Sequence, residues 1–172
     1  MYFDLARALV RDIGRITGLG NVVVGTAASR GGVSPAIGAL AEAREVAQVA
    51  ASMPASGRIV FEVSDIRIRG LVSLLRNDPR AIRFAESELR DLILHDIQTG
   101  TDHVDVLRAY LRLAGNKSAL AAHLHLSRPA VYSRLARIEA IVGDLSDGES
   151  MTSLHVALLI LDAQSRATGP IT

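Results

Sequence analysis

The stretch from Asn116 to Arg137, NKSALAAHLHLSRPAVYSRLAR, constrains the fold of this chain more than any other. Asn116 and Ser127 each stand where the N-cap of a helix is expected, and a tight break separates the two predicted helices. Basic residues are concentrated on the second helix. Two short helices joined in this way form a helix-turn-helix, whose second helix enters the major groove of DNA. The stretch therefore predicts a protein that acts through contacts with DNA and needs no active site.

The C-terminal part of the chain is predicted to form an all-helical domain. The domain is expected over residues 101–172, with helices at 102–114, 117–124, 128–142 and 154–163 and an acidic loop at 144–150. Thr101 or Asp102 can cap the first of these helices. Gly115 and Gly143 stand where the first and the third should end, because glycine suits the backbone geometry at a helix C-terminus.

The first 65 residues are predicted to alternate between helix and strand. The expected order is a helix at 5–16, a strand at 21–25, a loop at 26–34, a helix at 35–52 and a strand at 58–63. Two parallel strands joined by a helix form a βαβ unit, but two strands make a poor sheet by themselves. Either further strands lie elsewhere in the chain, or this segment is the end of a longer α/β domain that is truncated before Met1. The second alternative is the expectation.

Two further helices are expected between these regions, at residues 66–75 and 81–97. The polar run Gln98–Thr101 follows them and is the predicted domain boundary. The chain is thereby divided into residues 1–65, 66–100 and 101–172. The predicted fold class is mainly α: a C-terminal helix-turn-helix bundle, preceded by a partial α/β segment and a linking helix.

Composition excludes several classes of protein. Apolar residues make up 49% of the 172 residues and aromatic residues only 3%, so an aliphatic core is expected. The absence of cysteine excludes a disulfide framework, a zinc ribbon and thiol catalysis. His123 and His125 are two residues apart and would diverge on a helix, so no metal site is predicted, and no cofactor site either. The chain lacks a signal-peptide pattern and any run of about 18 apolar residues, so the cytoplasm is the expected location.

Charge is unevenly distributed along the chain. Residues 102–143 hold six basic and three acidic side chains, whereas residues 144–172 hold four acidic side chains and one basic. A local basic surface beside an acidic tail suits an element that contacts DNA, while a uniformly basic chain would indicate a non-specific coating protein. Charge alone does not decide between DNA contact and an ordinary solvated surface.

The second helix of the motif has separate core and outer faces on a helical wheel. Its buried side is expected to be Val131, Leu135, Ile138 and Val142. With these residues inward, Ala130, Ser133 and Arg137 face away, where small residues allow close approach to base edges and arginine can contact guanine. Lys117, Ser127, Arg128 and Arg134 are expected to hold phosphates or entry bases. The candidate DNA-binding residues are Lys117, Ser127, Arg128, Ala130, Tyr132, Ser133, Arg134 and Arg137.

Residues 102–163 resemble the C-terminal helix-turn-helix of the PucR/CdaR-type transcriptional regulators. The segments that carry the resemblance are LRAYLRLAGNKSALAAHLHLSRPAVYSRLARIEAIVGDLSD and LHVALLILDA. The family usually has His-Arg-Asn-Thr-Val where this chain has Ser127 to Val131, and its tyrosine usually stands at the position of Ser133. The apolar frame of the family is kept, while the residues expected to contact bases differ.

The first half resembles the same family in a second way. Its members often carry a degenerate GGDEF-like domain before the helix-turn-helix, and residues 22–28, 35–51 and 58–63 resemble the last part of that domain. No GGDEF signature is present in the sequence. The resemblance therefore implies a regulatory or dimerising role for this segment, without cyclase activity.

Taken as a whole, the resemblance implies a sequence-specific DNA-binding regulator that is not an enzyme. The resemblance further implies that the protein controls catabolic genes and binds double-stranded DNA as a homodimer on paired half-sites. It also implies a small-molecule effector that acts through a domain outside this chain. Two alternatives stay open. The helical domain could be a protein-interaction or dimerisation module that does not bind DNA, or the first half could be a nucleotide-binding enzyme.

Overall fold

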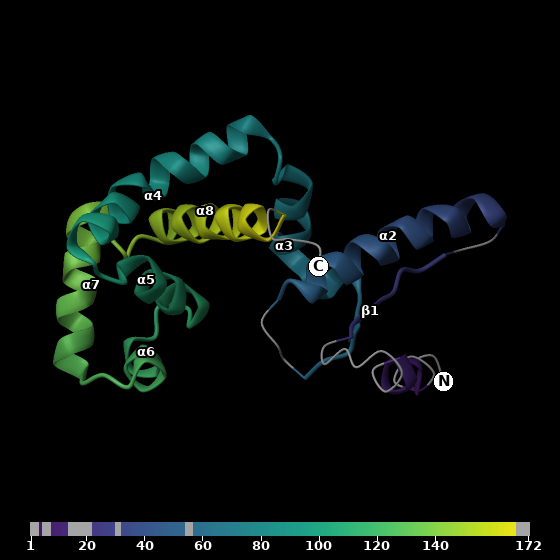
Figure 1. Cartoon of the computed structure of the whole chain (residues 1–172), viewed down its shortest axis with the longest axis horizontal. Coiled ribbons are helices and arrows are strands. Elements are labelled where there is room, and N and C mark those ends of the chain that lie inside the picture. Colours follow the sequence, from purple (N-terminus) through teal and green to yellow (C-terminus); the bar gives the residue numbers. More distant parts are fainter. Residues whose placement is uncertain (1–3, 5–7, 14–21, 30–31, 54–56, 168–172) are drawn as a thin grey trace. The chain divides into compact units, whose positions relative to one another are not determined.

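The computed structural model describes residues 4, 8–13, 22–29, 32–53 and 57–167. The chain divides into two compact units, Met1–Leu74 and Leu75–Thr172. Helices account for most of the described residues, and the only sheet among them has two strands (Figure 1). The predicted fold class, mainly α with a C-terminal helical bundle, is confirmed.

The first unit contains the expected βαβ arrangement. Its elements are β1 (Val24–Gly25), α2 (Val33–Ala51), β2 (Val60–Phe61) and α3 (Val63–Leu75). The two strands are parallel, with Val24 opposite Val60. The amide of Val24 donates to the carbonyl of Ile59 at 2.8 Å, and the amide of Thr26 donates to that of Phe61 at 2.8 Å. The helix expected at 35–52 and both strands are therefore present.

Both strands are shorter than predicted. The predicted strand 58–63 is reduced to two residues because its C-terminal end starts a helix instead. Asp65 Oδ2 accepts a hydrogen bond from the amide of Glu62 at 2.8 Å, and Asp65 Oδ1 pairs with the Arg58 guanidinium at 2.6 Å. This local carboxylate interaction turns the chain into α3 directly after Phe61. A β-branched sequence pattern does not reveal such a turn.

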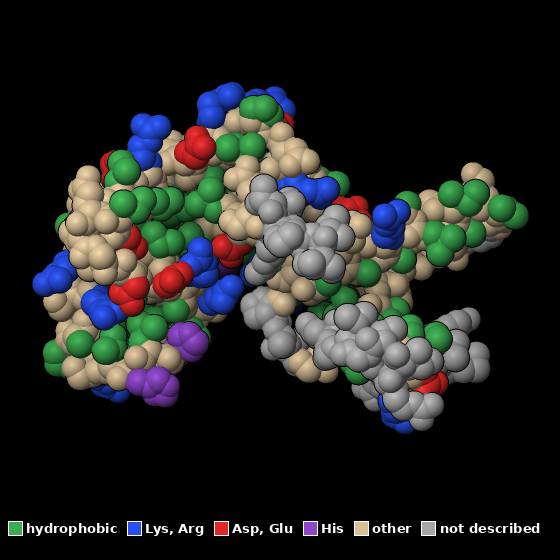
Figure 2. Space-filling view, viewed as in Figure 1, with side chains coloured by type: hydrophobic (Ala, Val, Ile, Leu, Met, Phe, Trp, Pro, Cys, Tyr) green, Lys and Arg blue, Asp and Glu red, His purple; other side chains and the backbone are tan. Residues whose placement is uncertain are grey.

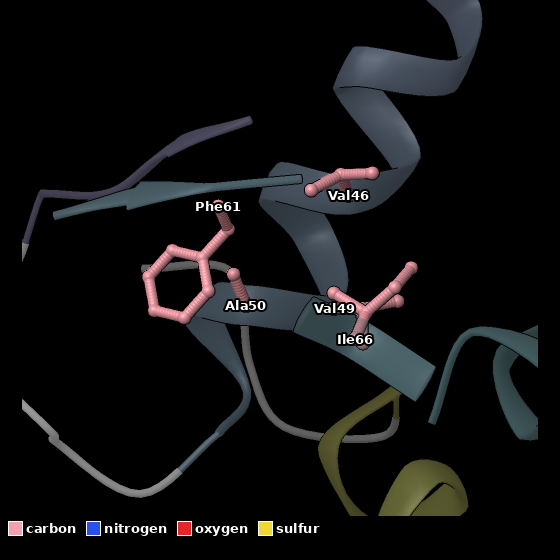
Figure 3. Packing of buried hydrophobic residues seen from close by; sticks show 5 residues of the cluster. All are labelled: Val46, Val49, Ala50, Phe61 and Ile66. Carbon is pink, nitrogen blue, oxygen red and sulfur yellow. The ribbon is translucent and has the colours of Figure 1, made fainter. Parts of the chain in front are cut away.

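The strand β1 lies directly against the helix α2. A Cβ atom on Gly25 would stand 2.0 Å from the carbonyl oxygen of Ala43 and 2.6 Å from the amide nitrogen of Ala47, so only glycine fits there. The core of the unit is a small apolar cluster in which the helix covers the sheet (Figure 3). Its members are Val46, Val49, Ala50, Phe61 and Ile66.

Parts of the N-terminal predictions lie outside the described residues. Within the helix expected at 5–16, residues 8–13 are helical, and the other positions of that helix are outside the described set. The same holds for residue 21 of the first predicted strand and for residues 30 and 31 of the loop expected at 26–34. That loop is shorter than predicted, because α2 begins at Val33 and includes Pro35 in its first turn.

The second unit is a bundle of five helices within the described residues. They are α4 (Pro79–Thr99), α5 (His103–Arg112), α6 (Lys117–Leu124), α7 (Arg128–Val142) and α8 (Gly148–Ala167). In Figure 1, α4 and α8 run side by side, and α5 and α7 also contact α4. The most deeply buried large side chains of the bundle are Leu89, Leu92, Leu107, Leu120, Leu135, Ile138, Leu145, Leu154 and Leu158.

The helix α4 belongs to this bundle and does not merely connect two domains. Its residues Ala85, Leu89 and Leu92 are fully buried, and its main contact is with α8. The predicted boundary at residues 98–101 therefore lies inside the second compact unit, whose first residue is Leu75. Such packing joins two helices that three other helices separate along the chain, and local sequence patterns do not report contacts of this kind.

The last helix is also longer than predicted. It begins at Gly148, because Asp147 Oδ2 accepts a hydrogen bond from the amide of Ser150 at 2.7 Å and so caps the helix. The acidic segment expected as a loop at 144–150 is consequently helical from Gly148 onward. The helix then continues to Ala167, beyond the predicted end at residue 163.

The turn between α4 and α5 is organised by one carboxylate, that of Asp96. Its Oδ1 accepts hydrogen bonds from the Thr101 hydroxyl at 2.7 Å and from the His103 amide at 2.9 Å, and its Oδ2 accepts one from the Val104 amide at 2.8 Å. The buried imidazole Nδ1 of His103 lies 3.1 Å from the same Oδ1. Asp96 thus caps α5 from the preceding helix. Asp102, one of the two predicted caps, does occupy the N-cap position of α5, but its side chain accepts no hydrogen bond from an α5 amide.

Asp96→Ala is expected to lower the free energy of unfolding of the second unit by about 1–3 kcal/mol, because two amides at the start of α5 lose their acceptor. Burial raises the pKa of Asp96, but hydrogen bonds from Thr101, Val104 and His103 outweigh it and hold that pKa below its ordinary value of 3.8. The carboxylate therefore stabilises the fold fully above pH 3.8, and this contribution is lost as the pH falls through the lower folded-state pKa.

Urea unfolding at neutral and acidic pH measures this effect. The difference between wild type and Asp96→Ala should shrink as the pH falls below 3.8. Asp91→Ala, at an exposed position of the same helix, should change stability by no more than about 0.5 kcal/mol at any pH. A pH-independent difference for Asp96→Ala would contradict the capping role of the charged carboxylate.

Candidate nucleic-acid interface

The helices α6 and α7 begin and end where the sequence predicts. Asn116 Oδ1 accepts a hydrogen bond from the Ala119 amide at 2.9 Å, and Ser127 Oγ accepts one from the Ala130 amide at 3.4 Å. Both predicted N-caps are therefore confirmed. His125 ends α6 in the left-handed backbone region, with φ at 53°, and α7 begins three residues later, at Arg128. This short connection fixes the two helices relative to each other.

The apolar frame of α7 is the predicted one. Val131, Leu135 and Ile138 are at most 2% exposed and pack against α4, α5 and α6. Val142, the last residue of the helix, is only half-buried. The buried stripe along α7 determines which of its side chains remain at the surface.

The predicted contact residues divide into two groups by exposure. Ser127, Arg128, Tyr132, Ser133 and Arg137 are exposed, whereas Lys117, Ala130 and Arg134 are half-buried. Ala130 does not share the fully outward orientation expected for it, because it lies on the flank of the helix, nearer to the core than Ser133. Ala136 and Pro129 are exposed on the same side as Ser133 and were missing from the predicted set. Continuing the helical period from Tyr132 by four residues would have found Ala136.

Arg134 is paired within the domain. Its Nη1 lies 2.8 Å and 3.0 Å from the two carboxylate oxygens of Asp102, just before the start of α5. Arg108 is paired in the same way with Asp162 at 3.1 Å and with Asp105. Figure 2 shows the consequence on the face in view, where blue and red side chains of this unit lie next to each other. The local positive charge predicted from the sequence is therefore partly neutralised.

The guanidinium groups of Arg128 and Arg137 are placed differently. Both side chains are exposed, and neither guanidinium forms an ion pair or hydrogen bond with other residues that the structure describes. Arg128 is the first residue of α7, and Arg137 lies along its outer face beside Ser133. Their charges remain available to an external anion.

Lys117 has a neutral partner. Its Nζ lies 4.9 Å from the ring centroid of Tyr132, so an ammonium group at the start of α6 contacts an aromatic ring on α7. This distance is within the range of a cation–π interaction. The contact joins the two helices of the motif at their surface.

No group of three or more potential metal ligands occurs among the described residues. None of the described helices has the length and apolarity needed to cross a membrane.

The first unit has an open cavity of about 820 Å³ beyond the carboxyl ends of β1 and β2. Its described lining consists of residues 26–29, Glu42, Val60 and residues 62–64.

A comparison with known families identifies the helical motif. Residues 103–160 match the family model described as the PucR C-terminal helix-turn-helix domain. No curated protein and no solved structure was found to match the chain. The match begins at the first residue of α5 and includes all of α6 and α7. Residues 103–160 are therefore a PucR-type C-terminal helix-turn-helix domain, a domain typical of DNA-binding transcription regulators.

Proposed function

We propose that this protein is a sequence-specific DNA-binding transcriptional regulator in which α7 enters the major groove. The observation that carries the proposal is the outer face of α7, where an uncompensated arginine lies beside small side chains in a matched helix-turn-helix domain. Small residues let the helix backbone approach the base edges, and an arginine there can donate two hydrogen bonds to guanine.

The contacts are divided among the residues as follows. Ser133 and Arg137 contact base edges, with Ala136 allowing close approach. Ser127 and Arg128, at the N-terminus of α7, contact a phosphate, which the positive end of the helix dipole also favours. Lys117 contacts a second phosphate. Tyr132 borders this surface. Ala130 is half-buried on the flank of α7, so it affects the shape of the surface and forms no direct contact with DNA.

Arg134 has a different role in this proposal. Because its guanidinium is held by Asp102, it supports the orientation of α7 from within the domain. Arg134→Ala is expected to weaken DNA binding less than about threefold, since exposed ion pairs contribute about 0–1 kcal/mol. Asp102→Asn should have a similarly small effect, because it breaks the same pair. A much larger loss for Arg134→Ala alone, measured by fluorescence anisotropy, would instead indicate direct contact with DNA.

The same proposal includes the location of the protein, its assembly, its target genes and its effector. The protein acts in the cytoplasm as a homodimer on two half-sites and controls catabolic genes in response to a small molecule bound by a domain outside this chain. The first unit is the end of a GGDEF-like domain with a regulatory or dimerising role. The parallel βαβ arrangement of β1, α2 and β2 supports an α/β origin for that unit.

Two other functions are weaker. A protein-interaction module without DNA binding would need no unpaired arginines along α7, yet Arg128 and Arg137 are exposed there. A nucleotide-binding enzyme would need cations near the phosphates, but the described lining of the cavity in the first unit includes Glu42 and Glu62 and no basic residue. Phosphate groups would be repelled by these carboxylates.

Selection of DNA sequences from a random library, followed by affinity measurements over a range of salt, tests the proposal. The logarithm of the binding constant should fall with the logarithm of salt concentration, with a slope of roughly −2 per domain for phosphate contacts by Lys117 and Arg128. Absence of binding at about 50 mM salt would refute the proposal. Capture of a protein partner without DNA would favour the interaction module.

A further inference from the structure

The contact between Lys117 and Tyr132 gives the basic surface a feature that the other cations lack. Arg134 and Arg108 are held by carboxylates, which cancel much of their charge. Lys117 is held by an uncharged ring, 4.9 Å from its ammonium nitrogen. A ring contact orients the ammonium through the electron density of the aromatic face and leaves its full charge in place. Lys117 is thus both positioned and available to an anion.

The position of this ammonium suits a phosphate. Lys117 is the first residue of α6, where the helix dipole is positive, and Asn116 caps the same helix end. A lysine side chain is long and flexible, so fixing it on binding costs conformational entropy. A side chain that already lies against a ring before DNA arrives loses less of that entropy, which is the general basis of preorganised binding.

We propose that Tyr132 is a positioning residue, which holds Lys117 ready to bind a DNA phosphate through its ring face and does not itself contact DNA through its hydroxyl. This inference rests on the proposed DNA binding and specifies how one of its contacts is organised. Tyr132 is 55% exposed although it is aromatic. Because the ring is half open to solvent, its described contact is with the ammonium above its face and not with the core.

Four variants separate the ring from the hydroxyl and from the ammonium. Tyr132→Leu removes the aromatic face and should weaken DNA binding about two- to fivefold. Tyr132→Phe keeps the face and should bind like the wild type. Lys117→Gln should lower the steepness of the salt dependence by about 0.9, the value for one phosphate contact. In the Lys117→Gln background, Tyr132→Leu should have no further effect, because the cation it positions is gone.

A second measurement reports the contact without DNA. Lys117 is the only lysine of the sequence, so lysine-specific isotope labelling gives one set of side-chain NMR signals for the whole chain. The ring should shift the ε-methylene signal upfield in the wild type and in Tyr132→Phe, and this shift should disappear in Tyr132→Leu. Circular dichroism should show unchanged helix content in all variants. Leucine and phenylalanine replace Tyr132 at an exposed position of α7, where neither should disturb the helix.

The outcomes are distinguishable. Equal losses for Tyr132→Phe and Tyr132→Leu would mean that the hydroxyl contacts DNA, which overturns the positioning role. Independent, additive effects of Tyr132→Leu and Lys117→Gln would overturn it as well. If the wild-type chain shows the upfield shift but binds no DNA at low salt, the proposed function fails, and the phosphate role of Lys117 fails with it. Coupled losses with rescue by Tyr132→Phe would support the proposal.

Discussion

Leu135→Ala is expected to lower the free energy of unfolding of the second unit by about 2–5 kcal/mol. Leu135 is 2% exposed and lies in the middle of α7, the helix that packs against α4, α5 and α6. Removing three carbon atoms there leaves a cavity that the surrounding helices can close only partly, so lost contacts and lost burial add to each other. The loss is a substantial fraction of the whole stability of a typical domain, which is about 5–15 kcal/mol.

Amide hydrogen exchange in the complete chain measures this loss within the second unit. The slowest amides of α5 and α7 should exchange roughly 30- to 5,000-fold faster in Leu135→Ala, which corresponds to the expected change in opening free energy. Ala140→Gln, at an exposed position of the same helix, is the matched control and should leave these rates within about threefold. Equal protection in Leu135→Ala and wild type would mean that α7 is not anchored through its apolar stripe.

Local sequence signals predicted the helix-turn-helix well. The caps Asn116 and Ser127 lie at the ends of the predicted helices, and each accepts the expected backbone hydrogen bond. The buried positions Val131, Leu135 and Ile138 follow from the period of the helix alone. These features depend on residues within one or two turns of each other, and for that reason a sequence pattern contains the information needed to predict them.

Interactions between distant segments could not be predicted in the same way. Asp96 caps α5 from another helix, and α4 joins the bundle through packing against α8. The sequence shows Asp96 and His103 as separate polar residues, and only the folded chain brings the carboxylate to the buried imidazole. The helix α8 begins earlier than predicted because Asp147 caps it. The acidic composition of residues 144–150 instead suggests a loop, so the sequence alone does not predict this cap.

The same limit applies to the candidate DNA-binding surface. Composition gave a local excess of positive charge, but charge counting cannot tell a paired arginine from an unpaired one. Asp102 neutralises Arg134, whereas Arg137 keeps its charge on the outer face of α7. Among the predicted arginines, Arg128 and Arg137 therefore keep charges that no described residue pairs, and this leads to a specific expectation for Arg137.

Arg137→Ala is expected to weaken binding to the selected DNA site by about 5- to 150-fold, the range for loss of one bidentate contact to a base, about 1–3 kcal/mol. The substitution should also relax the preference for one base pair of the site. Its effect on non-specific DNA should be smaller, because a single lost charge then affects only the electrostatic contribution. Competition experiments with single-base variants of the selected site measure both quantities.

The exposed Arg90 on α4 provides the matched control, because Arg90→Ala removes the same charge from a helix outside α6 and α7. It should change specific affinity less than about twofold at physiological salt, where charges about 8 Å or more apart are largely screened. Arg128→Ala should differ from both, with similar losses on all sequences and a shallower salt dependence, as expected for a phosphate contact. If Arg137→Ala instead weakened all sequences equally, Arg137 would be a phosphate contact, and base recognition by α7 would have to depend on Ser133 and its neighbours.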